Sequence, residues 1–68
     1  MPHIDITMYP GRNDEIKARL AKKVQECVSE DLGIPKAVVS VSVRDVEQEK
    51  WEDHVKEYPE STMFVRPE

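Results

Sequence analysis

The chain opens with a segment in which apolar and polar side chains alternate. The apolar set shares one face of the expected strand: Ile4, Ile6 and Met8. The polar set shares the other face: His3, Asp5 and Thr7. A period of two is typical of a half-buried β-strand, and Pro10-Gly11 is a turn signal. The pattern therefore predicts a first strand that ends before Pro10.

The next segment repeats apolar residues at helical spacing. Asn13 is a favourable N-cap, and two acidic residues follow it in the first turn, where the helix dipole favours negative charge. The apolar positions recur every three or four residues: Ile16, Leu20, Val24, Cys27, Val28 and Leu32. The opposite face carries polar residues: Lys17, Lys22, Gln25 and Ser29. With Gly33 as a stop signal, the pattern predicts one amphipathic helix of about five turns, with Cys27 in the core.

The segment from Ala37 to Val46 is the strongest strand prediction in the chain. Its apolar face carries Val39, Val41 and Val43, and its polar face carries Ser40, Ser42 and Arg44. A strand, a helix and a strand in this order predict a right-handed crossover between two parallel strands. We therefore expect an α/β (α+β) fold. Two strands and one helix do not close a core alone, so this unit is expected to assemble with a second copy.

The length of the chain also favours assembly. Its 68 residues form a single domain, residues 1–68, and such a domain buries only roughly 60% of the surface that its unfolded chain exposes. Cys27 is the only cysteine, so no disulfide forms within the chain. His3 and His54 have no metal-ligand spacing, and we expect neither a metal nor another cofactor. Self-association is the expected stabilising device.

The net charge of the chain limits the classes of partner that we expect. The net charge is −4 and 35% of the residues are charged, which is typical of a soluble protein. There is no basic stripe, so we expect no nucleic-acid partner. No apolar run approaches a membrane span, and the first residues lack the features of a signal peptide. These observations favour a reduced, cytoplasmic setting.

The tail after the second strand is mostly charged and less readable. Trp51 and Val55, four residues apart, suggest a short helix that Pro59 ends. We assign no role to His54. The segment 63–65 is expected to be either a short strand or an arm laid on a partner.

Pro2 is the unusual chemical feature of this sequence. Methionine is readily removed before a small residue such as proline, and Pro2 would then carry a free secondary amine. An ordinary α-amino group titrates at about 7.7–8.0, and a secondary amine is more basic. To act as a base at neutral pH, its pKa must be lowered by burial or by a nearby positive charge. Pro2 opens an apolar strand, and Arg12, after the strand-end turn, is a candidate for that charge.

Several motifs, taken in order, resemble the 4-oxalocrotonate tautomerase family. They are the opening Pro2-His3-Ile4-Asp5-Ile6, the turn Pro10-Gly11-Arg12, the helix start Asn13-Asp14-Glu15, the alternating strand Val39–Val43, and Trp51. The resemblance covers residues 2 to 51 in order and spacing. The opening and the tail, with Trp51 and Arg66-Pro67, are more similar to the branch of small putative and phenylpyruvate tautomerases.

The resemblance implies a β-α-β protomer, two copies of which form a four-stranded sheet backed by two helices. It also implies an isomerase that interconverts enol and keto forms of a 2-oxo acid. Pro2 would be the catalytic base, and Arg12 would bind the carboxylate or carbonyl oxygen. Trp51 would be an aromatic wall of the pocket, a group that another subunit often contributes. A homodimer is expected, with a trimer of dimers as the alternative.

One position departs from the family pattern. The type enzyme has a second arginine in its second strand, where this chain has Ser40. Arg44 lies on the same face, but it is ~13 Å further along the strand and does not replace that arginine directly. The departure favours a monocarboxylate such as phenylpyruvate over a dicarboxylate such as 2-hydroxymuconate. Ser40 is then a candidate for a hydrogen bond to the substrate.

Two other functions fit the same residues. Relatives with the same proline hydrate or dehalogenate unsaturated acids, but there the proline is a cationic acid and a carboxylate activates water. No such carboxylate can be picked out in this sequence. The second alternative is a non-catalytic oligomer that binds small acids, which fits the missing second arginine and a Pro2 that keeps Met1.

Overall fold

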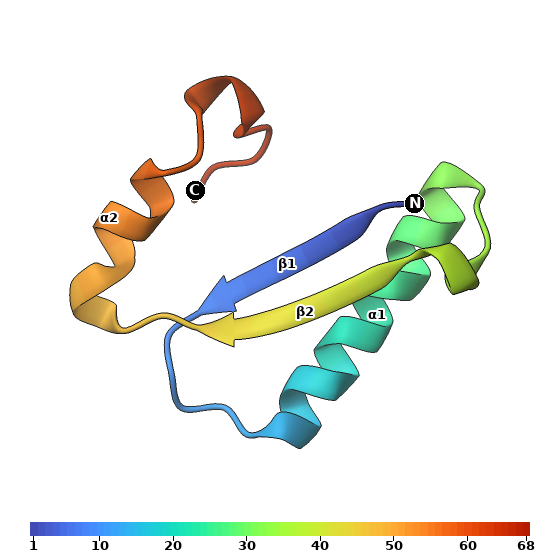
Figure 1. The fold of residues 1–68 in the computed structure, drawn as a ribbon, viewed down its shortest axis with the longest axis horizontal. Helices are drawn as coiled ribbons and strands as arrows, with labels where there is room; N and C mark the ends of the chain where they lie inside the picture. The colour runs from blue at the N-terminus through green and yellow to red at the C-terminus, as the bar shows by residue number, and fades with distance from the viewer.

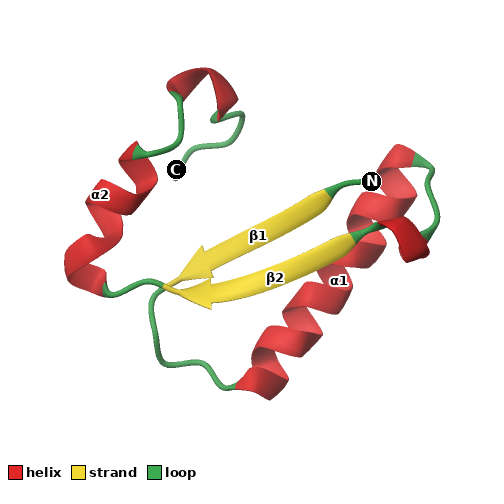
Figure 2. Ribbon diagram, viewed as in Figure 1, coloured by secondary structure: helices red, strands yellow, loops and turns green.

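The computed structural model describes every residue from Met1 to Glu68. The strands β1 (His3–Met8) and β2 (Ser40–Asp45) pair in parallel. Helix α1 (Asp14–Leu32) connects them, and a short helix α2 (Trp51–Lys56) follows β2. Figures 1 and 2 show the strands side by side, α1 running along them, and α2 beyond their carboxyl ends. The predicted β-α-β protomer is confirmed.

Helix α1 begins and ends at the predicted caps. Asn13 Oδ1 accepts a hydrogen bond from the N–H of Ile16 at 2.9 Å, which satisfies a free backbone donor of the first turn. At the other end Gly33 has a φ of 66°, a left-handed conformation that glycine adopts without steric cost. The 19 residues between the caps correspond to the predicted five turns.

The stripe that α1 turns toward the sheet is shifted from the predicted one. Three polar residues that the periodicity assigns to the solvent face are half-buried: Lys17, Gln25 and Ser29. Lys17 Nζ forms an ion pair with Asp45 Oδ1 at 2.8 Å, which ties the first turn of α1 to the end of β2. Gln25 Nε2 donates to two backbone carbonyls in the connection between α1 and β2. These contacts connect α1 to β2 and to the segment that leads into β2.

Cys27, in contrast, is exposed, so the prediction that it lies in the core is wrong. Two strands cover only a narrow stripe of a helix, and here that stripe lies on the side of Gln25. Leu32, at the end of the apolar series, is also 59% exposed. The apolar face of α1 is therefore wider than the surface that one copy offers it.

The two faces of the sheet differ as the alternation predicts. The apolar residues of both strands are half-buried on the side of α1: Ile4, Ile6, Met8, Val41 and Val43. Val39, which is 5% exposed, is the only buried residue of the chain. Large apolar side chains remain in solvent, with Phe64 91% exposed and Val65 82% exposed. A single copy thus leaves most of its apolar surface half covered.

The tail forms the predicted short helix and no strand. Helix α2 lies at the carboxyl ends of the strands, and a 3₁₀ turn over Glu60–Thr62 follows Pro59. Residues 63–65 pair with no strand within one copy. Of the two alternatives for this segment, an arm that packs on a partner stays a prediction. None of the helices combines the length and the apolar character that crossing a bilayer requires.

Candidate functional site

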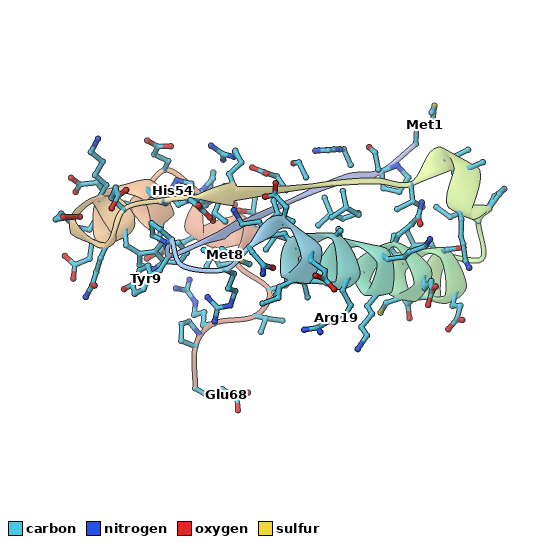
Figure 3. The ribbon with its side chains drawn as sticks, turned by 90° about the horizontal axis from the view of Figure 1, so that it is seen from below. Met1, Met8, Tyr9, Arg19, His54 and Glu68 are labelled. Atoms are coloured by element: carbon cyan, nitrogen blue, oxygen red, sulfur yellow. The ribbon has the colours of Figure 1, made fainter.

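Pro2 lies at the head of β1, next to the start of β2. It is half-buried, and its carbonyl oxygen accepts a hydrogen bond from the N–H of Ser40 at 3.3 Å. The strand register then pairs His3 with Ser40. Met1 projects from this end of the molecule and is 99% exposed, so no packing holds it in place (Figure 3). The structure thus brings together two of the four predicted site residues, Pro2 and Ser40.

Arg12 and Trp51 lie at the opposite end of β1. Arg12 is exposed and follows Gly11, whose φ of 130° turns the chain away from the strand. Trp51 begins α2, and its ring stands edge-on to that of Tyr9 with the centroids 5.2 Å apart. The six residues of β1 span about 20 Å, which exceeds the reach of an arginine side chain. One copy alone therefore does not bring the four predicted residues into one site.

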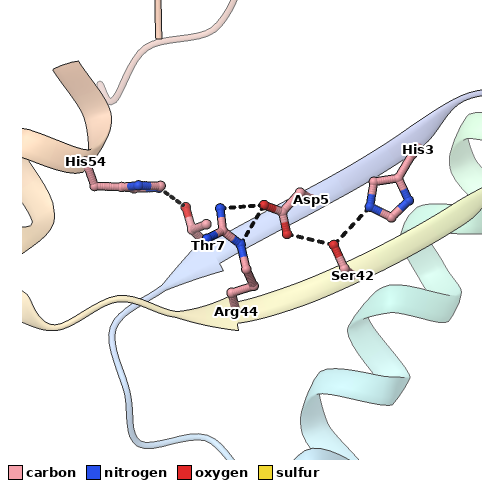
Figure 4. Close-up of polar contacts among 6 residues, drawn as sticks. All are labelled: His3, Asp5, Thr7, Ser42, Arg44 and His54. Atoms are coloured by element: carbon pink, nitrogen blue, oxygen red, sulfur yellow. Dashed lines mark hydrogen bonds and ion pairs between the residues drawn. The ribbon is translucent and has the colours of Figure 1, made fainter. Parts of the chain in front are cut away.

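A row of hydrogen-bonded side chains follows the polar face of the sheet (Figure 4). It begins with His3, whose Nδ1 lies 2.6 Å from Ser40 Oγ and whose Nε2 lies 3.0 Å from Ser42 Oγ. Ser42 Oγ donates to Asp5 Oδ1 at 2.7 Å. Arg44 closes the row, since its Nε and one terminal nitrogen donate to Asp5 Oδ2 at 2.8 and 2.7 Å.

This row fixes the charges of its two ionic members. The hydrogen bonds from Arg44 and from Ser42 hold the pKa of Asp5 below its ordinary value. Asp5 in turn raises the pKa of Arg44 through the same hydrogen bond and its negative charge. The guanidinium group of Arg44 is thus paired with Asp5.

His54, to which the sequence reasoning assigns no role, joins α2 to the sheet. Its Nε2 lies 2.9 Å from Thr7 Oγ1 (Figure 4). Its ring lies between those of Trp51 and Tyr58, with centroid distances of 5.7 and 5.5 Å. The three rings follow one another at spacings of three and four residues, which is the signal that could have revealed them. Tyr58 itself lies just beyond the end of α2. With Tyr9 these three residues form a row of rings at the carboxyl end of the sheet.

The groups around the start of the strands suit hydrogen bonding and proton transfer. Once Met1 is removed, the amine of Pro2, the Ser40 hydroxyl and the His3 imidazole occupy one end of the sheet. Ser40 also lines a hollow between α1 and β2 together with Lys22, and Lys22 makes no ion pair. No three His, Cys, Asp or Glu side chains gather in a position to hold a metal ion.

Comparison with known proteins places the chain in a family. The family described as "Tautomerase enzyme" matches residues 2–67. A probable tautomerase of Streptococcus pneumoniae is 38% identical over the whole of this chain and 93% of its own length. The 2-hydroxymuconate tautomerase of Comamonas testosteroni is 39% identical over 75% of this chain and 81% of its own. Tautomerase PptA of an Enterobacter species is 38% identical over 81% of this chain and 74% of its own. The chain therefore belongs to the tautomerase family, as its motifs indicate, and it is an isomerase with tautomerase activity.

Proposed function

We propose that this tautomerase interconverts the enol and keto forms of a 2-oxo acid, with Pro2 as the general base once Met1 is removed. The observation that carries the proposal is the half-buried place of Pro2 at the head of β1, beside Ser40. In the keto-to-enol direction the Pro2 nitrogen takes a proton from the carbon next to the carbonyl group, and the protonated amine then returns this proton to the enolate oxygen. The reverse direction returns the proton to carbon, so the reaction is an isomerisation.

The pocket needs a second copy of the chain, because Arg12 and Trp51 lie at the far end of β1 from Pro2. The free edge of β1 can pair with the β1 of a second copy. An antiparallel pair places the start of one strand beside the end of the other. This arrangement would bring the partner's Arg12 and the partner's Trp51 toward Pro2. A homodimer is sufficient for it, and a trimer of dimers keeps the same contact.

Each contributed group then has a defined role. The partner's Arg12 would bind the substrate carboxylate and stabilise the negative charge that develops on the enolate oxygen. Its positive charge, together with burial of the amine in the closed pocket, would lower the pKa of the Pro2 nitrogen toward neutral pH. The partner's Trp51 would wall the apolar part of the pocket.

Ser40 narrows the substrate to a monocarboxylate. A hydroxyl group offers a hydrogen bond but no charge, and Arg44 is held by Asp5. A dicarboxylate such as 2-hydroxymuconate would lack a second cation, whereas the enol of phenylpyruvate needs only one. The same contacts argue against hydration as the reaction, because Asp5, the carboxylate nearest to Pro2 in the sequence, is held by Arg44 and Ser42.

Ketonisation of the phenylpyruvate enol, followed by ultraviolet absorbance, tests the base. Intact mass first establishes that Met1 is absent, because a Pro2 nitrogen in an amide bond accepts no proton. We expect Pro2→Ala to lower kcat/KM by about 10²- to 10⁴-fold, the usual contribution of a positioned base. Circular dichroism checks that the variant is folded. Equal rates for wild type and Pro2→Ala would refute the role of Pro2.

A further inference from the structure

The polar row on the sheet determines which nitrogen of His3 carries a proton. Ser42 has a single hydroxyl proton, and it donates this proton to Asp5 at 2.7 Å. Asp5 is kept ionised by Arg44 and so only accepts hydrogen bonds. Toward His3, Ser42 Oγ can therefore only accept, and His3 Nε2, 3.0 Å away, must be the donor. A neutral His3 then has no proton on Nδ1.

The protonation of His3 decides the direction of the Ser40 hydroxyl. When His3 is neutral, Nδ1 is an acceptor, and the Ser40 hydroxyl donates to it across the 2.6 Å contact. When His3 is protonated, both ring nitrogens donate, and Ser40 Oγ accepts from Nδ1. The hydroxyl proton of Ser40 is then free to point away from the ring. Because Ser40 is exposed, this proton is available to a ligand.

We propose that His3 is a positioning residue for substrate binding, which in its protonated form turns the Ser40 hydroxyl into a donor toward the substrate carboxylate. This inference rests on the proposed function, in which Ser40 stands where the family pattern has a second arginine. Beside a neutral His3, Ser40 presents only lone pairs to an anion.

The proposal predicts pH-dependent binding, because histidine is the side chain whose charge ordinarily changes between about pH 5 and 8. The charged groups around His3 are Asp5 on β1, Arg44 on β2 and, once Met1 is removed, the amine of Pro2. Asp5 and Arg44 neutralise each other in an ion pair. The amine of Pro2 also titrates, so the test must separate its contribution from that of His3.

Direct binding of phenylacetate, a monocarboxylate without a 2-oxo group, provides this test. Its carboxyl group is ionised at both about pH 5.5 and about pH 8, since carboxyl groups titrate near ~4. By calorimetry, we expect the Met1-free protein to bind phenylacetate about tenfold more tightly at the lower pH, which corresponds to one charge-assisted hydrogen bond. The neutral analogue phenylacetamide should show little dependence on pH. Equal binding of phenylacetate at the two pH values would overturn the proposal.

Two variants and their combination separate His3 from Pro2. His3→Gln and Ser40→Ala should each remove the same part of the pH dependence, since the two residues act on one contact. The double variant should lose no more than either single variant. Any pH dependence of binding that is due to the Pro2 amine is common to wild type, the two single variants and the double variant. It therefore cancels when their pH dependences are compared. If the losses of the two single variants simply add, His3 does not act through Ser40 and the proposal fails.

Asp5→Asn should change the pH dependence of phenylacetate binding in a way that a purely structural role of His3 would not produce. Arg44 would donate to the amide oxygen of the introduced asparagine, and the amide nitrogen of that asparagine would donate to Ser42. Ser42 would then donate to His3 Nε2, and the proton of a neutral His3 would move to Nδ1. Ser40 would be an outward donor at both pH values, and phenylacetate should bind at about pH 8 nearly as tightly as at about pH 5.5.

A folded Asp5→Asn protein that keeps the wild-type pH dependence would overturn the proposal, and so would one that binds weakly at both pH values. Circular dichroism establishes that the variant is folded. Failure of Pro2 as the base is recognised separately, because it appears in the ketonisation rate of Pro2→Ala and not in the binding of phenylacetate.

Discussion

The two ends of the sheet are built from different kinds of contact. The amino end consists of polar groups joined by hydrogen bonds: Pro2, His3, Ser40 and Ser42. The carboxyl end consists of rings whose centroids lie 5.2 to 5.7 Å apart: Tyr9, Trp51, His54 and Tyr58. The first end has a candidate base but no aromatic wall, and the second has the wall and Arg12 but no base. This difference predicts that each pocket draws one half from each of two copies.

The largest expected effect is the recovery of ketonisation activity when two inactive variants are mixed, one altered at each end of the sheet. Pro2→Ala lacks the secondary amine of proline, and Arg12→Ala lacks the group that binds the carboxylate. When the two variants are unfolded together and refolded, random assembly leaves about a quarter of the pockets with both residues intact, if each pocket spans two chains. We expect the ketonisation rate to recover to about a quarter of the wild-type value under the conditions of that random assembly.

Each variant refolded alone is the matched control, and it should stay nearly inactive. Size-exclusion chromatography shows whether the mixture and the controls form the same oligomer. If the mixture is no more active than its two components while its oligomeric state is that of wild type, the pocket is not shared in the way that we propose.

Removing the aromatic wall should have a smaller effect. Trp51→Ala should lower kcat/KM by about tenfold, which corresponds to about 1.4 kcal/mol of lost transition-state stabilisation. Trp51→Phe keeps a ring and should stay within about threefold of wild type, because most of the apolar surface is retained. Steady-state ketonisation kinetics measure both variants. Wild-type kinetics for Trp51→Ala would instead assign this side chain only to the packing of α2 against Tyr9.

Much of the fold was predictable because its signals are local. The caps at Asn13 and Gly33 depend on a few neighbouring backbone groups, and the alternation of each strand depends only on the side-chain period. These predictions are confirmed. The prediction for Cys27 was wrong because exposure of a helical residue depends on how wide a sheet the helix meets. That width is a property of the assembled tertiary structure, and the helical period does not contain it.

The candidate site was predictable only in part. The observed register brings Pro2 beside Ser40. The strand pattern predicts the parallel pairing but not this register, because a shift of two residues leaves the same side chains on each face. The contact between His54 and Thr7 joins residues 47 positions apart, so no local pattern reports it. Arg12 is separated from Pro2 by the length of β1, and the place where the two would meet depends on a second copy. The pattern of one chain does not position that copy.

Acid should weaken the polar row of the amino half, and this is the smallest effect that we expect. Hydrogen bonds from Arg44 and Ser42 lower the pKa of Asp5 from its ordinary value of 3.8. A carboxylate whose pKa is lowered by folding stabilises the native state above its unfolded pKa, and this stabilisation is lost as the pH falls through the folded pKa. Wild type should therefore lose, below about pH 4, a contribution that Asp5→Asn does not have.

Urea unfolding at about pH 7 and at about pH 3, at one fixed protein concentration, measures this contribution. At the higher pH the midpoint of wild type should exceed that of Asp5→Asn by a small margin, because the ion pair with Arg44 is exposed to solvent. The margin should close at the lower pH. Arg44→Gln is the matched control, since it keeps Asp5 but removes its main partner, and its margin should close in the same way. A margin that is equal at both pH values would show that the ionisation of Asp5 contributes nothing to the amino half, because the other acidic residues are common to all three proteins.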